Sequence, residues 1–180
     1  DPESVFLSVS KTSHLNELSG MKSAYDDPMV QSLPPFERPK PGDPVALYQA
    51  SAIPYKLTRE DLLICLITSR KKQRWGFPKA STEGFGTVEA AMLAAHHKAG
   101  VTGELSDSPI GRYRHLKYGK VCEVSVYGME VKEDFAAWPE QRLRSKKWIR
   151  ASATSHLLVK PELQDMLERL RRTLGTHLAS

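Results

Sequence analysis

The sequence predicts an α/β (α+β) domain in which helices pack on a sheet, and three segments carry this prediction. Residues 61–69 form an unbroken apolar run, the pattern of a central strand covered on both faces. Residues 87–99 have the composition of a helix that ends at Gly100, where a left-handed residue is expected. Residues 161–178 form an amphipathic helix with one apolar stripe. Its expected buried residues are Leu163, Met166, Leu167, Leu170 and Leu174.

The composition is ordinary for a soluble domain, with a mild excess of positive charge. The chain has 180 residues, of which 40% are hydrophobic and 26% charged, and a formal net charge of +5. This length allows one domain with a sizeable core, and the charge fits an anionic partner without requiring one. No apolar run reaches the ~18 residues of a membrane span, and no signal-peptide pattern is present. Cys65 and Cys122 fall in expected strands, which favours buried thiols, a reducing compartment and a cytoplasmic location.

Residues 1–44 are predicted to be an N-terminal arm or linker, because prolines crowd the end of this stretch. A short strand at residues 5–9 and a turn of helix at residues 15–21 are expected within it. The arm is either loosely held or packed on the domain or on a second subunit, so a homodimer formed through the arm stays open. Met21 is a candidate translation start. The folded domain is expected to span residues 45–178.

The strands are expected on both sides of the first helix. Residues 45–55 have strand composition, which Pro54 is expected to break. A hairpin is predicted at Tyr118-Gly119, followed by a long strand at residues 121–131 in which Gly128 marks a bulge. Cys122, Val124 and Val126 should share one face of that strand.

The helix before Gly100 has recognisable signals at both ends. Thr87 is a candidate cap for the first turn, and Glu89 lies where the helix dipole favours an acid. Helical spacing predicts one buried face, made of Val88, Ala91, Met92, Ala95 and Ala99. Another face should carry Ala94, His97 and Lys98, which are three and four residues apart.

The stretch from Trp75 to Val101 resembles the Nudix box, the loop–helix–loop of hydrolases that cleave a nucleoside diphosphate linked to another group. The Pro78-Lys79 pair and the Ala99-Gly100-Val101 ending carry this resemblance. The later segment also resembles the branch that hydrolyses diphosphoinositol and diadenosine polyphosphates; its matching residues are Trp138, Pro139, Glu140, Arg142, Arg144 and Trp148. The resemblance covers residues 45–170. It implies the Nudix (MutT-like) fold, a mixed sheet sandwiched between helices.

The catalytic acids of the family pattern are missing from the matching positions. Aligned on Gly100, the family arginine falls on Leu93, the next glutamate on Ala94, and the paired glutamates on His97 and Lys98. The loop is about one residue short, so the earlier glutamate falls near Phe85 or Gly86, with Glu83 close by.

The loss of these carboxylates affects the ability of the box to hold Mg²⁺. In the family these carboxylates hold Mg²⁺, which bridges phosphate oxygens and activates water. A lysine ammonium cannot be a ligand, and histidine is a poor ligand for Mg²⁺. We therefore expect a degenerate box, no retained metal ligands, and a pseudoenzyme that binds a phosphorylated small molecule or polyphosphate.

Two basic segments supply candidate residues for such a ligand. Residues 69–74 form a loop with four cations, and residues 110–120 alternate cationic and aromatic side chains. Arginine offers phosphate a planar fork, whereas lysine offers a point charge. The candidate phosphate-binding residues are Arg70, Lys72, Arg74, Lys79, Lys98, Arg112, Arg114 and Lys117.

Two alternatives stay open. An active hydrolase with relocated ligands would use His96 and His97 for Zn²⁺ or Mn²⁺, helped by Glu83 or Glu140. Adjacent helical residues point about 100° apart, which disfavours a shared ion. Its candidate catalytic residues are Glu83, Glu140 and His97, with Glu133 as a further candidate base. The second alternative is a scaffold or nucleic-acid-binding module, because basic residues interleaved with aromatics suit single strands.

Overall fold

A computed structural model of the chain describes residues 38–178, with side chains up to residue 175. The expectations for the strand at 5–9, the helix at 15–21, Met21 and a dimer through the arm lie outside the described residues.

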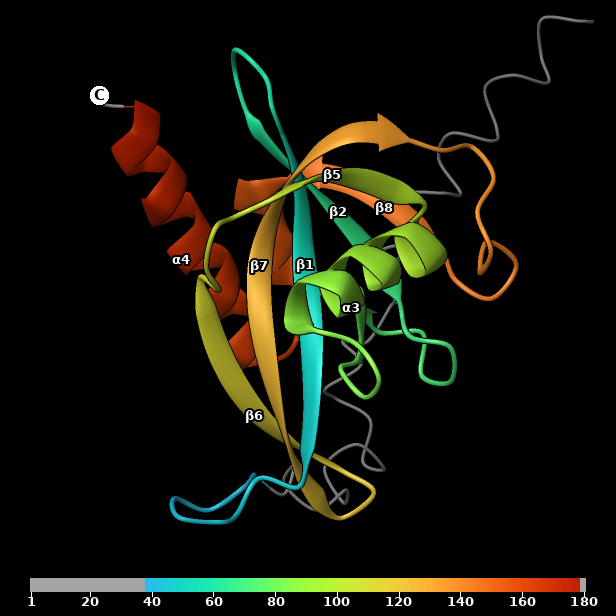
Figure 1. The fold of residues 1–180 in the computed structure, drawn as a ribbon. Helices are drawn as coiled ribbons and strands as arrows, with labels where there is room; N and C mark the ends of the chain where they lie inside the picture. Colours follow the sequence, from blue (N-terminus) through green and yellow to red (C-terminus); the bar gives the residue numbers. More distant parts are fainter. Residues whose placement is uncertain (1–37, 179–180) are drawn as a thin grey trace, which may run out of the picture. The chain divides into compact units, whose positions relative to one another are not determined.

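Eight strands form one mixed sheet within residues 38–178 (Figure 1). The strands are β1 (Leu47–Leu57), β2 (Leu62–Thr68), β3 (Trp75–Gly76), β4 (Lys79–Ser81), β5 (Val101–Leu105), β6 (Gly111–Lys117), β7 (Lys120–Asp134) and β8 (Lys146–Arg150). The main path runs β3-β2-β1-β7-β5, while β4 pairs with β1, β6 with β7 and β8 with β2. β1 and β7 run parallel, and the other pairs are antiparallel.

Helices cover both faces of this sheet, as the sequence predicts. Helix α3 (Thr87–Ala94) continues into the π-helical turn η1 (Ala95–Ala99), and the 3₁₀ turn η2 (Ala151–His156) precedes helix α4 (Pro161–Leu178). Figure 1 shows α3 and α4 on opposite sides of the central strands. β2 contributes to both cores: Ile64 and Leu66 pack with α4, whereas Cys65 and Ile67 pack with α3 and η1. The predicted stripe of α4 is confirmed, with Leu174 partly buried and the other four residues buried.

The prediction that Pro54 breaks the first strand is wrong, because β1 runs through it. One edge of β1 pairs Pro54 with Met129 of β7. The other edge pairs with β4 as far as Ser51 and with β2 only from Tyr55 onward. Alternate residues of a strand point their N–H groups to the same edge, so the Pro54 nitrogen lies between these two partners, where no donor is required.

The bulge predicted at Gly128 is also wrong. β7 keeps its register with β1 there, through the pair Ile53 and Gly128. The sheet irregularity lies instead between Thr102 and Gly103 of β5. A Cβ at position 128 would lie 2.8 Å from Cδ1 of Leu170, so this glycine allows α4 to approach the sheet.

The helix before Gly100 exists as predicted, and its buried face is confirmed in part, at Ala91, Ala95 and Ala99. Its buried residues are Ala90, Ala91, Ala94, Ala95 and Ala99. Val88, expected inside, is 47% exposed. Within α3, Ala90, Ala91 and Ala94 define this face, so Val88 lies off it. The π-helical turn, which holds more residues than an α-helical one, changes the spacing only from Ala95 onward. The methyl side chains let this helix lie close to Ala50 and Ala52 of β1 in the same core.

Of the predictions for the two ends of this helix, one is confirmed and one is wrong. Gly100 is left-handed, with φ 63° and ψ 37°, as predicted. Gly86 is the N-cap residue, and no side chain caps the helix. The Thr87 hydroxyl instead shares a 2.7 Å hydrogen bond with the Tyr127 hydroxyl, so the predicted cap is wrong.

Candidate anion-binding site

One lysine contact joins the end of the helix to the sheet. Lys79 is held in β4, where it pairs with Ser51 of β1. Lys98 lies in η1, just before the left-handed Gly100. Its Nζ donates a hydrogen bond to the main-chain carbonyl oxygen of Lys79. The ammonium group therefore lies against the first residue of β4.

The residues at the family's acid positions do not fit Mg²⁺. Ala94 is 1% exposed and offers only a methyl group, although the helical spacing predicted it outside the buried face. His97 is exposed, and the Lys98 ammonium already donates to a carbonyl. Within residues 38–178, no three His, Cys, Asp or Glu side chains gather closely enough to hold a metal ion. Mg²⁺ thus has no carboxylate ligand set at these positions.

Cations surround Lys79 on the side of the sheet that faces α4. Burial, together with the charges of Lys160, Lys117 and Lys98, lowers the pKa of Lys79 to about 8, whereas Cys122 has the opposite effect. Lys160 directly precedes α4. Its pKa is also lowered, first by burial and then by Arg74 and Lys72 of the basic loop, with Glu162 opposing.

Cations also surround Lys98, the residue that donates to the Lys79 carbonyl. Burial lowers its pKa, followed by the charge of Arg144, while Glu140 raises it and Lys117 and Arg70 lower it. Arg144 is held in place by an ion pair of 2.8 Å to Glu140 and a hydrogen bond of 3.0 Å to the Thr68 carbonyl.

The structure thus brings six of the eight candidate phosphate-binding residues into one electrostatic neighbourhood. We call this neighbourhood the cation cluster; it consists of Arg70, Lys72, Arg74, Lys79, Lys98, Lys117, Arg144 and Lys160. Lys160 could not be predicted from the sequence, because a lysine before a helix has no distinctive pattern. Arg144 was noted only as part of the Trp-Pro-Glu segment.

The other two candidates lie elsewhere. Arg112 and Arg114 alternate along β6 with Tyr113 and His115, so they point to the opposite face of the strand. Arg114 is paired with Glu123 of β7 at 3.2 Å. These two arginines therefore do not join the cation cluster.

A neutral histidine lies beside the cluster. Burial, together with the charges of Lys79, Lys160 and Lys117, lowers the pKa of His115 to about 4, while a backbone hydrogen bond of Leu116 has the opposite effect. Nε2 of His115 lies 3.1 Å from Oε1 of Gln49. A neutral polar side chain, that of His115, therefore lies next to the lysines of the cluster.

The candidate catalytic residues are dispersed. Glu83 is exposed in the loop before α3, and its main-chain N–H donates to Ser81. Glu140 is committed to Arg144, as expected for a surface acid beside an arginine, and its N–H caps the carbonyl of His97 at 3.0 Å. His96 packs edge-on against Phe135. Glu133 lies exposed on β7.

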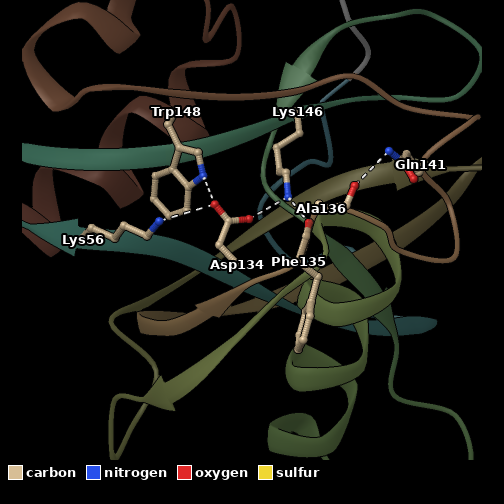
Figure 2. A network of polar contacts seen from close by, with 7 residues as sticks. All are labelled: Lys56, Asp134, Phe135, Ala136, Gln141, Lys146 and Trp148. Atoms are coloured by element: carbon tan, nitrogen blue, oxygen red, sulfur yellow. Dashed lines mark hydrogen bonds and ion pairs between the residues drawn. The ribbon is translucent and has the colours of Figure 1, made fainter.

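A second polar network, which was not predicted from the sequence, stabilises the C-terminal end of β7. The carboxylate of Asp134 accepts hydrogen bonds from Lys56 at 3.3 Å, from Lys146 at 2.8 Å and from the Trp148 indole at 2.8 Å (Figure 2). Lys146 also donates to the Phe135 carbonyl. The network ties β1, β7 and β8 together and has the character of a structural support.

Comparison with known proteins agrees with this architecture. No family model matches the chain. The chain is 28% identical to Nudix hydrolase 13, mitochondrial, of Arabidopsis thaliana over 149 residues, which cover 70% of this chain and 74% of that protein. The crystal structure of a C. elegans Ap4A hydrolase binary complex has a TM-score of 0.62 at 16% identity, covering 73% of this chain and 99% of that one.

A third similarity extends over more of the chain. The Nudix domain of Shewanella oneidensis NrtR, crystallised with ADP ribose, has a TM-score of 0.56 at 12% identity and covers 89% of this chain and 97% of that one. The fold and the arrangement of helices around the mixed sheet are those of Nudix proteins. The chain therefore has the Nudix fold, and its sequence is similar to those of curated Nudix hydrolases.

Proposed function

We propose that this Nudix domain binds a phosphorylated small molecule or polyphosphate at the cation cluster and lacks ordinary Mg²⁺-dependent pyrophosphohydrolase activity. The observation that carries the proposal is the Lys98 ammonium, which occupies a box position where the family places a carboxylate and donates to Lys79. A fixed cation there attracts phosphate oxygens directly, but it cannot activate a water molecule as a metal does.

The charge balance around this contact supports binding rather than catalysis. Three lysines act on Lys79, and the groups that perturb it include no carboxylate. Close, half-buried cations repel one another, so an anion that neutralises them gains binding energy. Magnesium is not needed for that neutralisation.

Several curated relatives are named as hydrolases, so activity must be measured directly. Calorimetry with pyrophosphate, a nucleoside triphosphate and an inositol pyrophosphate, at low salt and with or without Mg²⁺, tests the proposal. We expect binding in both conditions and no phosphate release. The absence of binding to all three ligands would contradict it, and so would release that depends on Mg²⁺. An active enzyme with relocated ligands would instead lose its turnover in His97→Ala.

Nucleic-acid binding is a second candidate, favoured by the tip of the β6–β7 hairpin. Tyr118 is 86% exposed there, between Lys117 and Lys120. An exposed aromatic ring flanked by cations suits base stacking and backbone contact. We expect any such binding to weaken steeply with salt and to fall in Tyr118→Ala. A gel-shift series with single-stranded RNA measures both effects, and unchanged binding in this variant would exclude the hairpin tip.

The location is a separate question. No helix of the described part is long and apolar enough to cross a membrane. We propose the cytoplasm, in keeping with the two buried free thiols. The names of several relatives carry mitochondrial or chloroplastic labels, and cell fractionation distinguishes these locations.

A further inference from the structure

The backbone of Lys79 is held in place, whereas its amine has no polar partner within residues 38–178. Its backbone is fixed by pairing with β1, and its carbonyl is bound by Lys98. Among the described residues, its Nζ makes no hydrogen bond or ion pair, and the indole nitrogen of Trp138 is the one fully buried side-chain donor left without a partner. The Lys79 amine therefore retains contact with solvent.

The groups that act on this amine favour its neutral form. The cations that do so are Lys160 before α4, Lys117 of β6 and Lys98 of η1, whereas the buried thiol Cys122 of β7 has the opposite effect. Burial and these cations lower the pKa of Lys79 to about 8. Near pH 8 such an amine has on the order of a hundredfold more neutral form than an ordinary lysine. Neutral lysine amines are nucleophiles that form Schiff bases with carbonyl compounds.

We propose that Lys79 is a reactive amine that forms imines with phosphorylated aldehydes and ketones. The neighbouring lysines bind the phosphate, and in this respect the inference rests on the proposed function. The Nζ lone pair attacks the carbonyl carbon, a proton moves from nitrogen to oxygen, and loss of one water leaves the imine. The step needs neither an oxidant nor a reductant. Open-chain sugar phosphates belong to this class of ligand.

Labelling with pyridoxal 5′-phosphate tests the inference on the full chain. The imine is trapped with borohydride, and the modified lysines are located by mass spectrometry after digestion. We expect Lys79 to be labelled at least about tenfold faster than the exposed Lys120 and Lys147, and pyrophosphate to protect it. Its labelling rate should reach half of its maximum near pH 8, where the amine loses its proton.

Two variants sharpen this experiment. Lys79→Arg keeps the charge and should remove the fast label, with an unchanged circular dichroism spectrum. Lys160→Gln removes a neighbouring cation and should move the half-maximal pH upward, because less repulsion raises the pKa of Lys79. An unchanged pH profile in Lys160→Gln would contradict the assigned surroundings.

The two proposals can fail separately. If Lys79 is labelled no faster than Lys120 while calorimetry still detects pyrophosphate binding, the inference is overturned and the proposed function stands. If pyridoxal without its phosphate labels Lys79 equally well and pyrophosphate does not bind, both are overturned.

Discussion

The ammonium group of Lys98 donates to the main-chain carbonyl oxygen of Lys79, so a cation at the end of the helix lies against the first residue of β4. This contact relates the end of η1 to β4 and fixes the centre of the cation cluster. The predictions below test its charge, its support and its surroundings.

Reversing the charge of Lys98 should weaken anion binding. Lys98→Glu replaces an attraction for phosphate by a repulsion, and we expect pyrophosphate affinity to fall at least about tenfold, or about 1.4 kcal/mol. Calorimetry at low salt measures the change. Arg171→Glu makes the same charge reversal on the exposed side of α4 and should have little effect. Equal losses in the two variants would indicate an effect of net charge alone.

Gly100 should not tolerate a side chain. A Cβ at this position would lie 2.8 Å from atoms of Trp138, in a backbone with φ 63°. Gly84 has φ 78° but nothing within 4 Å, so Gly84→Ala is a matched control for backbone strain alone. We expect Gly100→Ala to lower the free energy of unfolding by about 2 kcal/mol or more, and Gly84→Ala by about 1 kcal/mol. Denaturant unfolding measures both, and equal losses would rule out the close packing of Trp138.

Asp134 should support the fold at neutral pH. Burial raises its pKa, but hydrogen bonds and charge from Lys146, together with Trp148 and Lys56, outweigh this and lower it. A lowered folded-state pKa gives stability that is present above the ordinary value and lost as pH falls through the folded value. Asp134→Asn should cost about 1 kcal/mol at pH 7 and remove this acid sensitivity.

Unfolding followed from pH 7 to pH 2 checks this prediction. Glu133→Gln, a change to the neighbouring exposed carboxylate, is the control and should leave the profile close to that of the parent. An Asp134→Asn profile that parallels the parent would show that the network does not carry the acid dependence.

His115 should make the domain sensitive to mild acid. Burial and the cations Lys79, Lys160 and Lys117 keep its pKa near 4, below the ordinary 6.5. The unfolded chain therefore binds a proton first, and stability falls as pH drops from about 6.5 to about 4. His115→Gln keeps a polar side chain and should flatten this part of the curve. Thermal unfolding across that range measures it, and a steep curve in the variant would point to other groups.

Much of the fold could be predicted because the hydrophobic patterns are long and each lies within a single strand or helix. The apolar run that became β2 and the leucine stripe of α4 needed no tertiary information. The Tyr118-Gly119 turn is confirmed, with φ of 53° and 71°, values that match the hairpin turn with two left-handed residues. Gly100 was recognisable because few residues adopt its conformation readily.

The errors arose where tertiary contacts override local signals. Pro54 is tolerated because β1 changes partners beside it, which no local pattern reveals. The rotation of α3 about its axis is set by its packing on β1, so periodicity alone placed Val88 inside and Ala94 outside, the reverse of what the structure shows. Lys160 joins the cation cluster only through folding, across more than 80 residues of chain from Lys79. Arg112 and Arg114 failed to join it because strand alternation turns them away.

The most direct test of the central claim is pyrophosphate binding and phosphate release measured on the same purified protein, with and without Mg²⁺. The account predicts binding that persists in a metal chelator, weakens in Lys98→Glu, and leaves the pyrophosphate intact. Rapid hydrolysis that requires Mg²⁺ and continues unchanged in Lys98→Glu would contradict it.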